Sequence, residues 1–176
     1  MQWIKEKRVI LLLVLALAPI LAVTPGLAMA QGTAVAFAGL KTDPTVPVQI
    51  QSDTLAINQT DGTALFTGNV IVTQGDMKLQ AQTVKVNYSA DQKAIQSLHA
   101  DGGVTIAAGT EAAEAETADY LPATGDLTML GHVLLTQGQS VISGEKLVMS
   151  LITGTGTMEG RVTTTFAPAA ASPVKK

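Results

Sequence analysis

Alternating apolar and polar residues dominate the chain between about Val48 and Phe166. The stretch FTGNVIVTQGDMKLQAQTVKVN, from Phe66 to Asn87, alternates, is interrupted at Gly75 and then alternates again. A period of two is typical of strands that bury one face, and the abundant Thr, Val and Ile suit a half-buried pleated surface. No long segment shows a helical stripe of apolar residues. The pattern predicts an all-β domain.

The alternating pattern also repeats along the chain. The motif Gly-x-Val-x-(Val/Ile/Leu)-x-x-Gly begins at Gly68, Gly102 and Gly131, with offsets of 34 and 29 residues. A half copy precedes it at residues 52–57 and a degenerate copy follows at 158–162. One strand pair cannot bury its apolar face alone, so neighbouring pairs have to stack. The repeats predict an elongated body, either a long jelly roll or a β-solenoid.

The ends of such a body leave strand edges unpaired, and these edges are templates for another chain. Head-to-tail self-association, which produces open filaments, is therefore expected. Turns between strands are expected where Gly gathers with Asp, Thr or Gln, at residues 60–63, 74–76, 100–103, 123–126 and 136–139.

The first thirty residues predict an export signal that lies outside the fold. Three basic residues precede an apolar run of 15 residues, 9–23, and Ala28-Met29-Ala30 forms a small-residue cleavage site. The run is shorter than the roughly 20 residues that a spanning helix needs. We expect cleavage of residues 1–30 and a mature chain that starts at Gln31. An uncleaved membrane anchor is the alternative.

Composition divides the remaining chain into three parts. Residues 31–47 are rich in small residues and include Pro44 and Pro47, which predicts a flexible N-terminal arm. Residues 48–166 form the expected β-domain, and 167–176 have the composition of a flexible tail.

Charge and cysteine usage exclude several functions. The whole chain has 11 basic and 14 acidic residues, and the signal accounts for three basic residues and one acidic residue. The mature chain would therefore have 8 basic and 13 acidic residues, a net charge of −5. An acidic chain is a poor partner for nucleic acid, whose binding depends on neutralising phosphates. The chain has no cysteine. A disulfide framework, a thiol nucleophile, a Cys-ligated metal and a lipoprotein anchor are therefore excluded.

Catalytic and metal-binding patterns are weak. His99 and His132 have no ligand partners at metal-binding spacing, so we expect them to be solvated or close to turns. Four carboxylates form a local cluster, which we expect on a solvated strand face rather than in an acid/base site: Glu111, Glu114, Glu116 and Asp119. A polysaccharide-acting β-helix enzyme would align carboxylates inward, whereas most here fall at turns or on the polar parity. We predict no enzyme, no cofactor and no metal.

Three motifs together resemble one known family. FTGNVIVTQG precedes a strand with Lys-x-x-Ala, follows VQIQSDTLAI, and is followed near the end by GRVTTTF. The chain resembles the OstA-like family of lipopolysaccharide-transport proteins from about Pro47 to Pro168.

The resemblance implies a fold, a ligand and partners. The fold would be a twisted, open β-jelly roll whose subunits join end to end in the periplasm. The ligand would be lipopolysaccharide, with its acyl chains inside the roll. The partners would be an inner-membrane-anchored LptC-like protein and the N-terminal domain of an LptD-like outer-membrane protein.

An apolar groove has a physical reason, since exposing one acyl chain of about 12 to 14 carbons to water costs on the order of 10 kcal/mol. Small inward residues such as Ala64 and Ala113 favour a groove over a filled core. The match to the family favours Val48, Ile106 and Tyr120 as lumen-facing. The candidate lipid-binding residues are Val48, Ile50, Phe66, Val70, Val72, Val104, Ile106, Tyr120, Met129 and Leu135.

Two other functions stay open at this point. The repeats and unpaired edges also suit a structural or adhesin-like filament module. If the N-terminal segment is not cleaved, the chain would be the anchored, LptC-like member of the same family.

Overall fold

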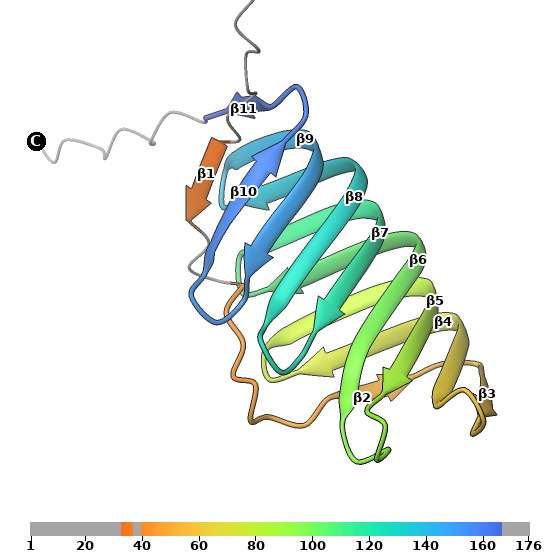
Figure 1. Ribbon diagram of the computed structural model, residues 1–176. Coiled ribbons are helices and arrows are strands. Elements are labelled where there is room, and N and C mark those ends of the chain that lie inside the picture. The colour runs from red at the N-terminus through yellow and green to blue at the C-terminus, as the bar shows by residue number, and fades with distance from the viewer. Residues whose placement is uncertain (1–32, 37–39, 167–176) are drawn as a thin grey trace, which may run out of the picture.

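The computed structural model describes residues 33–36 and 40–166, and all the regular structure there is β (Figure 1). The expected signal at residues 1–30 and the expected tail at 167–176 lie outside the described residues. Within the described ranges, no helix is long and apolar enough to cross a membrane. The strands are β1 (Thr33–Ala36), β2 (Gln49–Gln51), β3 (Thr54–Asn58), β4 (Thr63–Gln74), β5 (Met77–Tyr88), β6 (Ile95–Ala108), β7 (Glu111–Leu121), β8 (Asp126–Gln137), β9 (Ser140–Ser150), β10 (Thr155–Glu159) and β11 (Thr163–Thr165).

The strands form a single antiparallel sheet with the order β1-β10-β9-β8-β7-β6-β5-β4-β2. From β4 to β10 each strand pairs with the next one along the chain. At one end β2 and β3 pair with different halves of β4, and at the other end β10 and β11 pair with different halves of β9. The predicted stack of strand pairs, with half copies at its ends, is confirmed.

Each long strand bends near its middle. In β4, β6 and β8 the bends fall at Gly68, Gly102 and Gly131, where the φ angles are 82°, 88° and 84° and the pairing register shifts. Glycine reaches these angles without steric cost. The turn expected at residues 100–103 is therefore wrong, because β6 continues through it. The glycines change the direction of the strand without reversing it.

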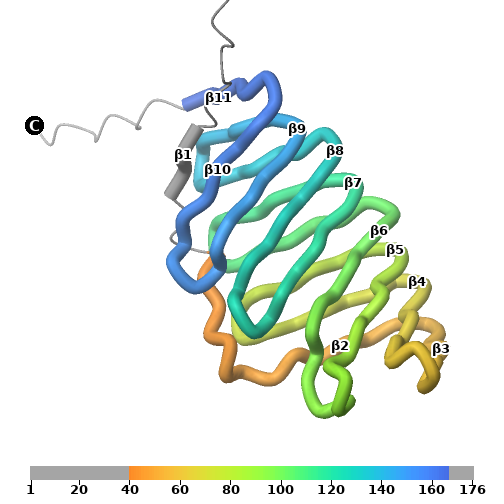
Figure 2. Tube along the Cα trace, in the orientation of Figure 1, coloured from red at the N-terminus to blue at the C-terminus, as the bar shows by residue number. Residues whose placement is uncertain are grey.

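The bends fold the sheet into two layers, joined on one side and open on the other (Figures 1 and 2). Layer A contains β2, β11 and the strand halves that meet at the turns at residues 74–77, 108–111 and 137–140. Layer B contains β1, β3, β10 and the halves that meet at the turns at residues 88–95, 121–126 and 150–155. We call the open side, where the two rows of turns face each other, the seam.

The segment before β2 differs from the flexible arm expected for residues 31–47. Thr33–Ala36 form β1, which pairs with β10, and the side chain of Leu40 is fully buried in the core. In Figure 2 the chain after residue 40 runs along one side of the roll and reaches β2 at the opposite end. Local composition does not predict the structure of this segment, because β1 and Leu40 are held by contacts with distant parts of the chain.

Candidate functional site

The inner faces of the two layers are apolar along the whole roll. Seven of the ten candidate lipid-binding residues are buried, and the other three are half-buried and pack against the same cluster. The buried ones are Val70, Val72, Val104, Ile106, Tyr120, Met129 and Leu135, and the half-buried ones are Val48, Ile50 and Phe66. The structure thus brings together on one inner surface residues that lie far apart in the sequence.

The inner surface becomes accessible at the N-terminal end of the roll. Leu55 and Ile57 on β3 are 50% and 66% exposed. They pair directly with Phe66 and Ala64 on β4, so they lie on the same inward face. Because no further strand covers them, the apolar face continues to the end of the described domain and is open there.

Small inward residues have a different effect from the one the sequence suggests. Ala64, Ala100 and Ala113 are buried, with 0–2% of their surface exposed. Small side chains on facing layers let the layers approach until the interior is close-packed. The small residues therefore thin the roll instead of leaving an open groove, and a guest chain requires the layers to separate.

A buried hydrogen bond links the layers near the seam. The hydroxyl of Tyr120, in layer B, donates to Oε1 of Gln74, in layer A, at 2.5 Å. Both side chains are 1% exposed. Burial raises the pKa of the Tyr120 phenol to about 12, because the charged form is disfavoured away from water.

Sequence reasoning missed Gln74 because it counted only apolar inward residues. A signal was present, since Gln74 and Gln137 each follow two inward apolar residues on the same parity and precede a turn glycine. The first and third copies of the repeat thus place a glutamine at the inner edge of layer A, where the interior meets the seam, and the second copy has Ala108 there.

Glu111 also lies at this edge, which corrects the solvated face expected for its cluster. The residue is 5% exposed, and its carboxylate accepts hydrogen bonds from the Leu40 amide at 3.1 Å and from Nε2 of Gln137 at 2.8 Å. A buried carboxylate needs such donors to offset its lost hydration. Glu114 and Glu116 are exposed, as expected.

Residues 40–48, which we call the strap, lie along the seam. Nε2 of Gln74 donates to the carbonyls of Val46 and Asp43 at 3.0 and 3.4 Å. A pocket of about 420 Å³ separates residues 44–48 of the strap from the layer B turns at Lys93 to Ile95 and Pro122 to Ala123. The strap is thus held by layer A and stands away from part of layer B.

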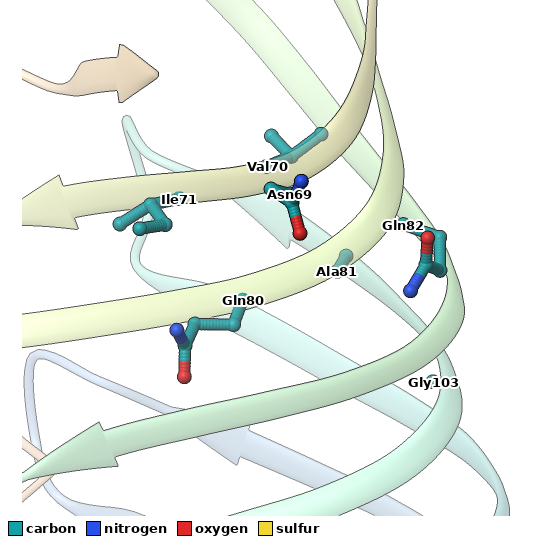
Figure 3. Close-up of a pocket in the computed structure, with 7 residues that line it drawn as sticks. All are labelled: Asn69, Val70, Ile71, Gln80, Ala81, Gln82 and Gly103. Atoms are coloured by element: carbon teal, nitrogen blue, oxygen red, sulfur yellow. The ribbon is translucent and has the colours of Figure 1, made fainter. Parts of the chain in front are cut away.

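Two further pockets lie on the bent side. Figure 3 shows the larger, of about 370 Å³, around Asn69, Gln80 and Gln82. The smaller, of about 230 Å³, is lined by Arg161 and by six residues that lie 63 positions after their counterparts in the larger pocket, including His132, Ser143 and Glu145. Because the two are repeat-equivalent, we attribute both to the geometry of the bends rather than to a specialised site.

The two histidines have carboxylate partners on neighbouring strands. Nδ1 of His99 lies 2.7 Å from Asp119 and Nδ1 of His132 lies 2.8 Å from Glu116. The hydrogen bond and charge of Glu116 raise the pKa of His132, although the side chain is 83% exposed. In the described part of the chain, no group of three or more such residues could hold a metal ion.

An open-ended β-jelly roll with an apolar interior therefore defines the class of this protein. A family model described as "LptA/(LptD N-terminal domain) LPS transport protein" matches residues 49–155. The chain belongs to this family of lipopolysaccharide-transport proteins, and the OstA-like resemblance of the sequence is confirmed. The family and fold are those of a transport protein and not of an enzyme class.

Two relatives agree with this assignment. The structure is similar to LptH of Pseudomonas aeruginosa, described as the LptA homologous periplasmic component of the lipopolysaccharide transport device, with a TM-score of 0.65 over 72% of this chain and 99% of that chain. At 19% identity this likeness supports the jelly-roll fold. A protein of Rhizobium meliloti (strain 1021), described as uncharacterized, is 32% identical over 141 residues, covering 74% of this chain and 76% of its own length.

Proposed function

We propose that the protein binds lipopolysaccharide and carries it across the periplasm as a subunit of a bridge between the inner and outer membranes. The observation that carries this proposal is the apolar inner face, which runs from the buried Leu135 to the exposed Ile57 at the end of the roll. An inner face that continues to an open end suits a ligand that is passed from one subunit to the next.

The energetics of the lipid favour a shielded path. Each buried CH₂ group contributes about 0.8 kcal/mol, so a chain of about 12 carbons gains on the order of 10 kcal/mol inside the roll. Separating the layers exposes the apolar side chains that line them, and the incoming acyl chains cover these again. The exchange of one apolar contact for another makes transport along the roll feasible.

Photo-crosslinking tests the lipid path. A photoreactive residue at Ile106 or Tyr120, which point inward, should capture lipopolysaccharide, whereas one at Thr105 on the outer face of β6 should not. All three positions lie in paired strands. Capture at Thr105 with none at Ile106 and Tyr120 would refute the inner path.

The bridge requires partners at both ends of the roll. β2 and β3 at one end, and β1 and β11 at the other, each have one edge without a partner strand among the described residues. Pairing of these edges with an LptC-like protein, with further copies of this chain, or with the N-terminal domain of an LptD-like protein would continue the sheet. Pull-down with each partner's purified domain would identify which end it uses.

The periplasmic location is part of the same proposal. It rests on the family, on the similarity to a periplasmic component and on the export signal expected in residues 1–30. N-terminal sequencing of the protein from the periplasmic fraction should begin at Gln31. An intact N-terminus in the membrane fraction would instead support the anchored, LptC-like alternative.

A further inference from the structure

The strap joins the two rows of turns across the seam. The Leu40 amide donates to Glu111 at a layer A turn, at 3.1 Å. Two residues later, the Thr42 amide donates to the carbonyl of Leu151 at a layer B turn, at 2.9 Å. The hydroxyl of Thr42 also donates to the carbonyl of Gln74 in layer A, at 3.4 Å. The strap therefore fastens one layer to the other along the open side.

The bent side cannot open in the same way. The six strands from β4 to β9 each run without a break from one layer into the other. Their bends are covalent backbone, and each strand is hydrogen-bonded to its neighbours before and after the bend. Layer separation therefore has to occur at the seam, with the glycine bends as the hinge.

The chemistry of a glycolipid also favours the seam as the place where the ligand crosses the wall of the roll. A glycolipid keeps its sugars in water while its chains lie inside the roll, so some part of each molecule has to pass through the wall. Continuous strands close the bent side, whereas the seam is a gap between turns that the strap covers. If a lipid moves along the interior with its headgroup outside, the connection between chains and headgroup has to pass along the seam. The strap blocks that passage from residue 40 to residue 48.

We propose that the strap, residues 40–48, is a removable wall of the lipid path, which leaves the seam when acyl chains enter from the side. This inference rests on the proposed function and names the route by which the same interior is filled. The lipid is recognised by its chemistry alone, as apolar chains joined to a polar headgroup.

The way the strap is fastened suits a reversible movement. Leu40 anchors the start of the strap with its buried side chain and its amide bond to Glu111. From Thr42 onward the strap is held by separate hydrogen bonds to Gln74 and Leu151 and not by a continuous ladder like the one that joins the strands. Each such bond contributes little net stability, because water can replace the lost partner once the strap has moved. The pocket of about 420 Å³ beside residues 44–48 leaves this part without close packing against layer B.

Crosslinking of the strap tests the proposal, and the cysteine-free chain makes the chemistry specific. Thr45 on the strap and Ala123 on a layer B turn are both exposed and line the same pocket. In the variant T45C/A123C, a short, reducible bis-maleimide joins the two thiols and holds the strap on the seam. Purified lipopolysaccharide is then offered to protein that carries a photoreactive residue at Ile106.

We expect capture at Ile106 to fall by about tenfold or more in the crosslinked form, because the binding-competent population becomes small. Reduction of the linker should restore capture in the same sample. The matched control is A94C/A123C, which joins two layer B turns beside the same pocket and leaves the strap free. Its crosslinked form should capture as much lipid as its reduced form.

Each outcome has a distinct meaning. Equal capture with and without the T45C/A123C crosslink overturns the removable strap and favours loading through the open end of the roll. An equal loss in the A94C/A123C control also overturns it, since rigid turns would then explain the effect. If uncrosslinked protein captures no lipid at any inward position, the proposed function fails, and the strap's role fails with it.

A second variant acts in the opposite direction. Leu40→Ala removes most of a fully buried side chain at the start of the strap, and the lost packing weakens the strap's attachment to the core. We expect faster lipid capture at Ile106 with the strand pairing preserved in the circular dichroism spectrum. Slower or unchanged capture by the folded variant would contradict the proposal.

Discussion

The Tyr120 hydroxyl in layer B donates to the Gln74 side chain in layer A, and Gln74 in turn donates to the carbonyls of Asp43 and Val46 in the strap. One buried glutamine thus joins both layers and the strap. All of these polar atoms lie at the inner end of the seam. The contact is therefore a sensitive place to measure how firmly the roll is closed.

Removing the Tyr120 hydroxyl should loosen this contact. In Tyr120→Phe, Oε1 of the buried Gln74 loses its donor, and we expect a loss of about 1–3 kcal/mol in the free energy of unfolding at neutral pH. Urea unfolding measures it. The chain's other tyrosine supplies the control, because Tyr88→Phe keeps the hydrogen bond between the layers. An equal loss in both variants would show that the bond between layers is not the cause.

The same residue predicts an alkaline decline in stability. The pKa of Tyr120 is about 12 in the folded protein and 10 in the unfolded reference, so between these values the unfolded chain releases its proton first. Stability is therefore intact below pH 10 and falls as the pH rises towards 12, by on the order of 2–3 kcal/mol. The difference in unfolding free energy between the native protein and Tyr120→Phe should therefore become smaller from pH 10 to pH 12. A constant gap in unfolding free energy would contradict the assignment.

Two adjacent glycines at the bend of β6 allow backbone strain and side-chain crowding to be measured separately. Both Gly102 and Gly103 have φ near 88°, a region that costs an alanine about 1–2 kcal/mol. A methyl group on Gly102 would also lie 2.6 Å from Cβ of Gln82, whereas one on Gly103 meets nothing within 4 Å. Gly102→Ala should therefore destabilise the protein clearly more than Gly103→Ala. Equal losses in thermal or urea unfolding would mean that crowding at the bend contributes nothing.

These glycines also show where sequence reasoning stops. The repeated motif correctly places the strands, because a period of two reports one buried face wherever the strands go. Gly68 at a bend and Gly75 at a turn both have positive φ, 82° and 59°. Local sequence cannot separate a strand that bends from one that reverses. The difference depends on which strand accepts the next hydrogen bonds.

The strap and its anchors illustrate a second limit. The inward apolar residues follow from alternation, and all ten candidates lie on the inner surface of the roll. The strap has no periodicity, and its order depends on Glu111, 71 positions from Leu40, and on Gln74, about 30 positions from Asp43 and Val46. Contacts of this range arise only once the repeats have stacked.

His132 should titrate above its ordinary range. Its pKa is raised first by the hydrogen bond that its Nδ1 donates to Glu116 and then by the charges of Glu116 and Glu145. Any stabilisation from this pair is present below about pH 6.5 and is lost as the pH rises through the folded pKa. In Glu116→Gln the His132 pKa should fall towards the ordinary value, as measured by NMR titration of its ring protons. The His99 ring, paired with Asp119, provides an internal comparison, and an unchanged His132 pKa would exclude Glu116 as the cause.

Head-to-tail association predicts complementation between two variants that are each blocked at one end. Ile57 at the N-terminal end and Phe166 at the other are 66% and 75% exposed, so Ile57→Lys and Phe166→Lys should leave the fold intact while placing charge at an end. Each variant alone should be monomeric in analytical ultracentrifugation. An equimolar mixture should stop at dimers, because each variant retains the end that the other lacks, whereas the native chain should form longer assemblies. Dimers of one variant alone would instead indicate that the roll pairs through two identical ends.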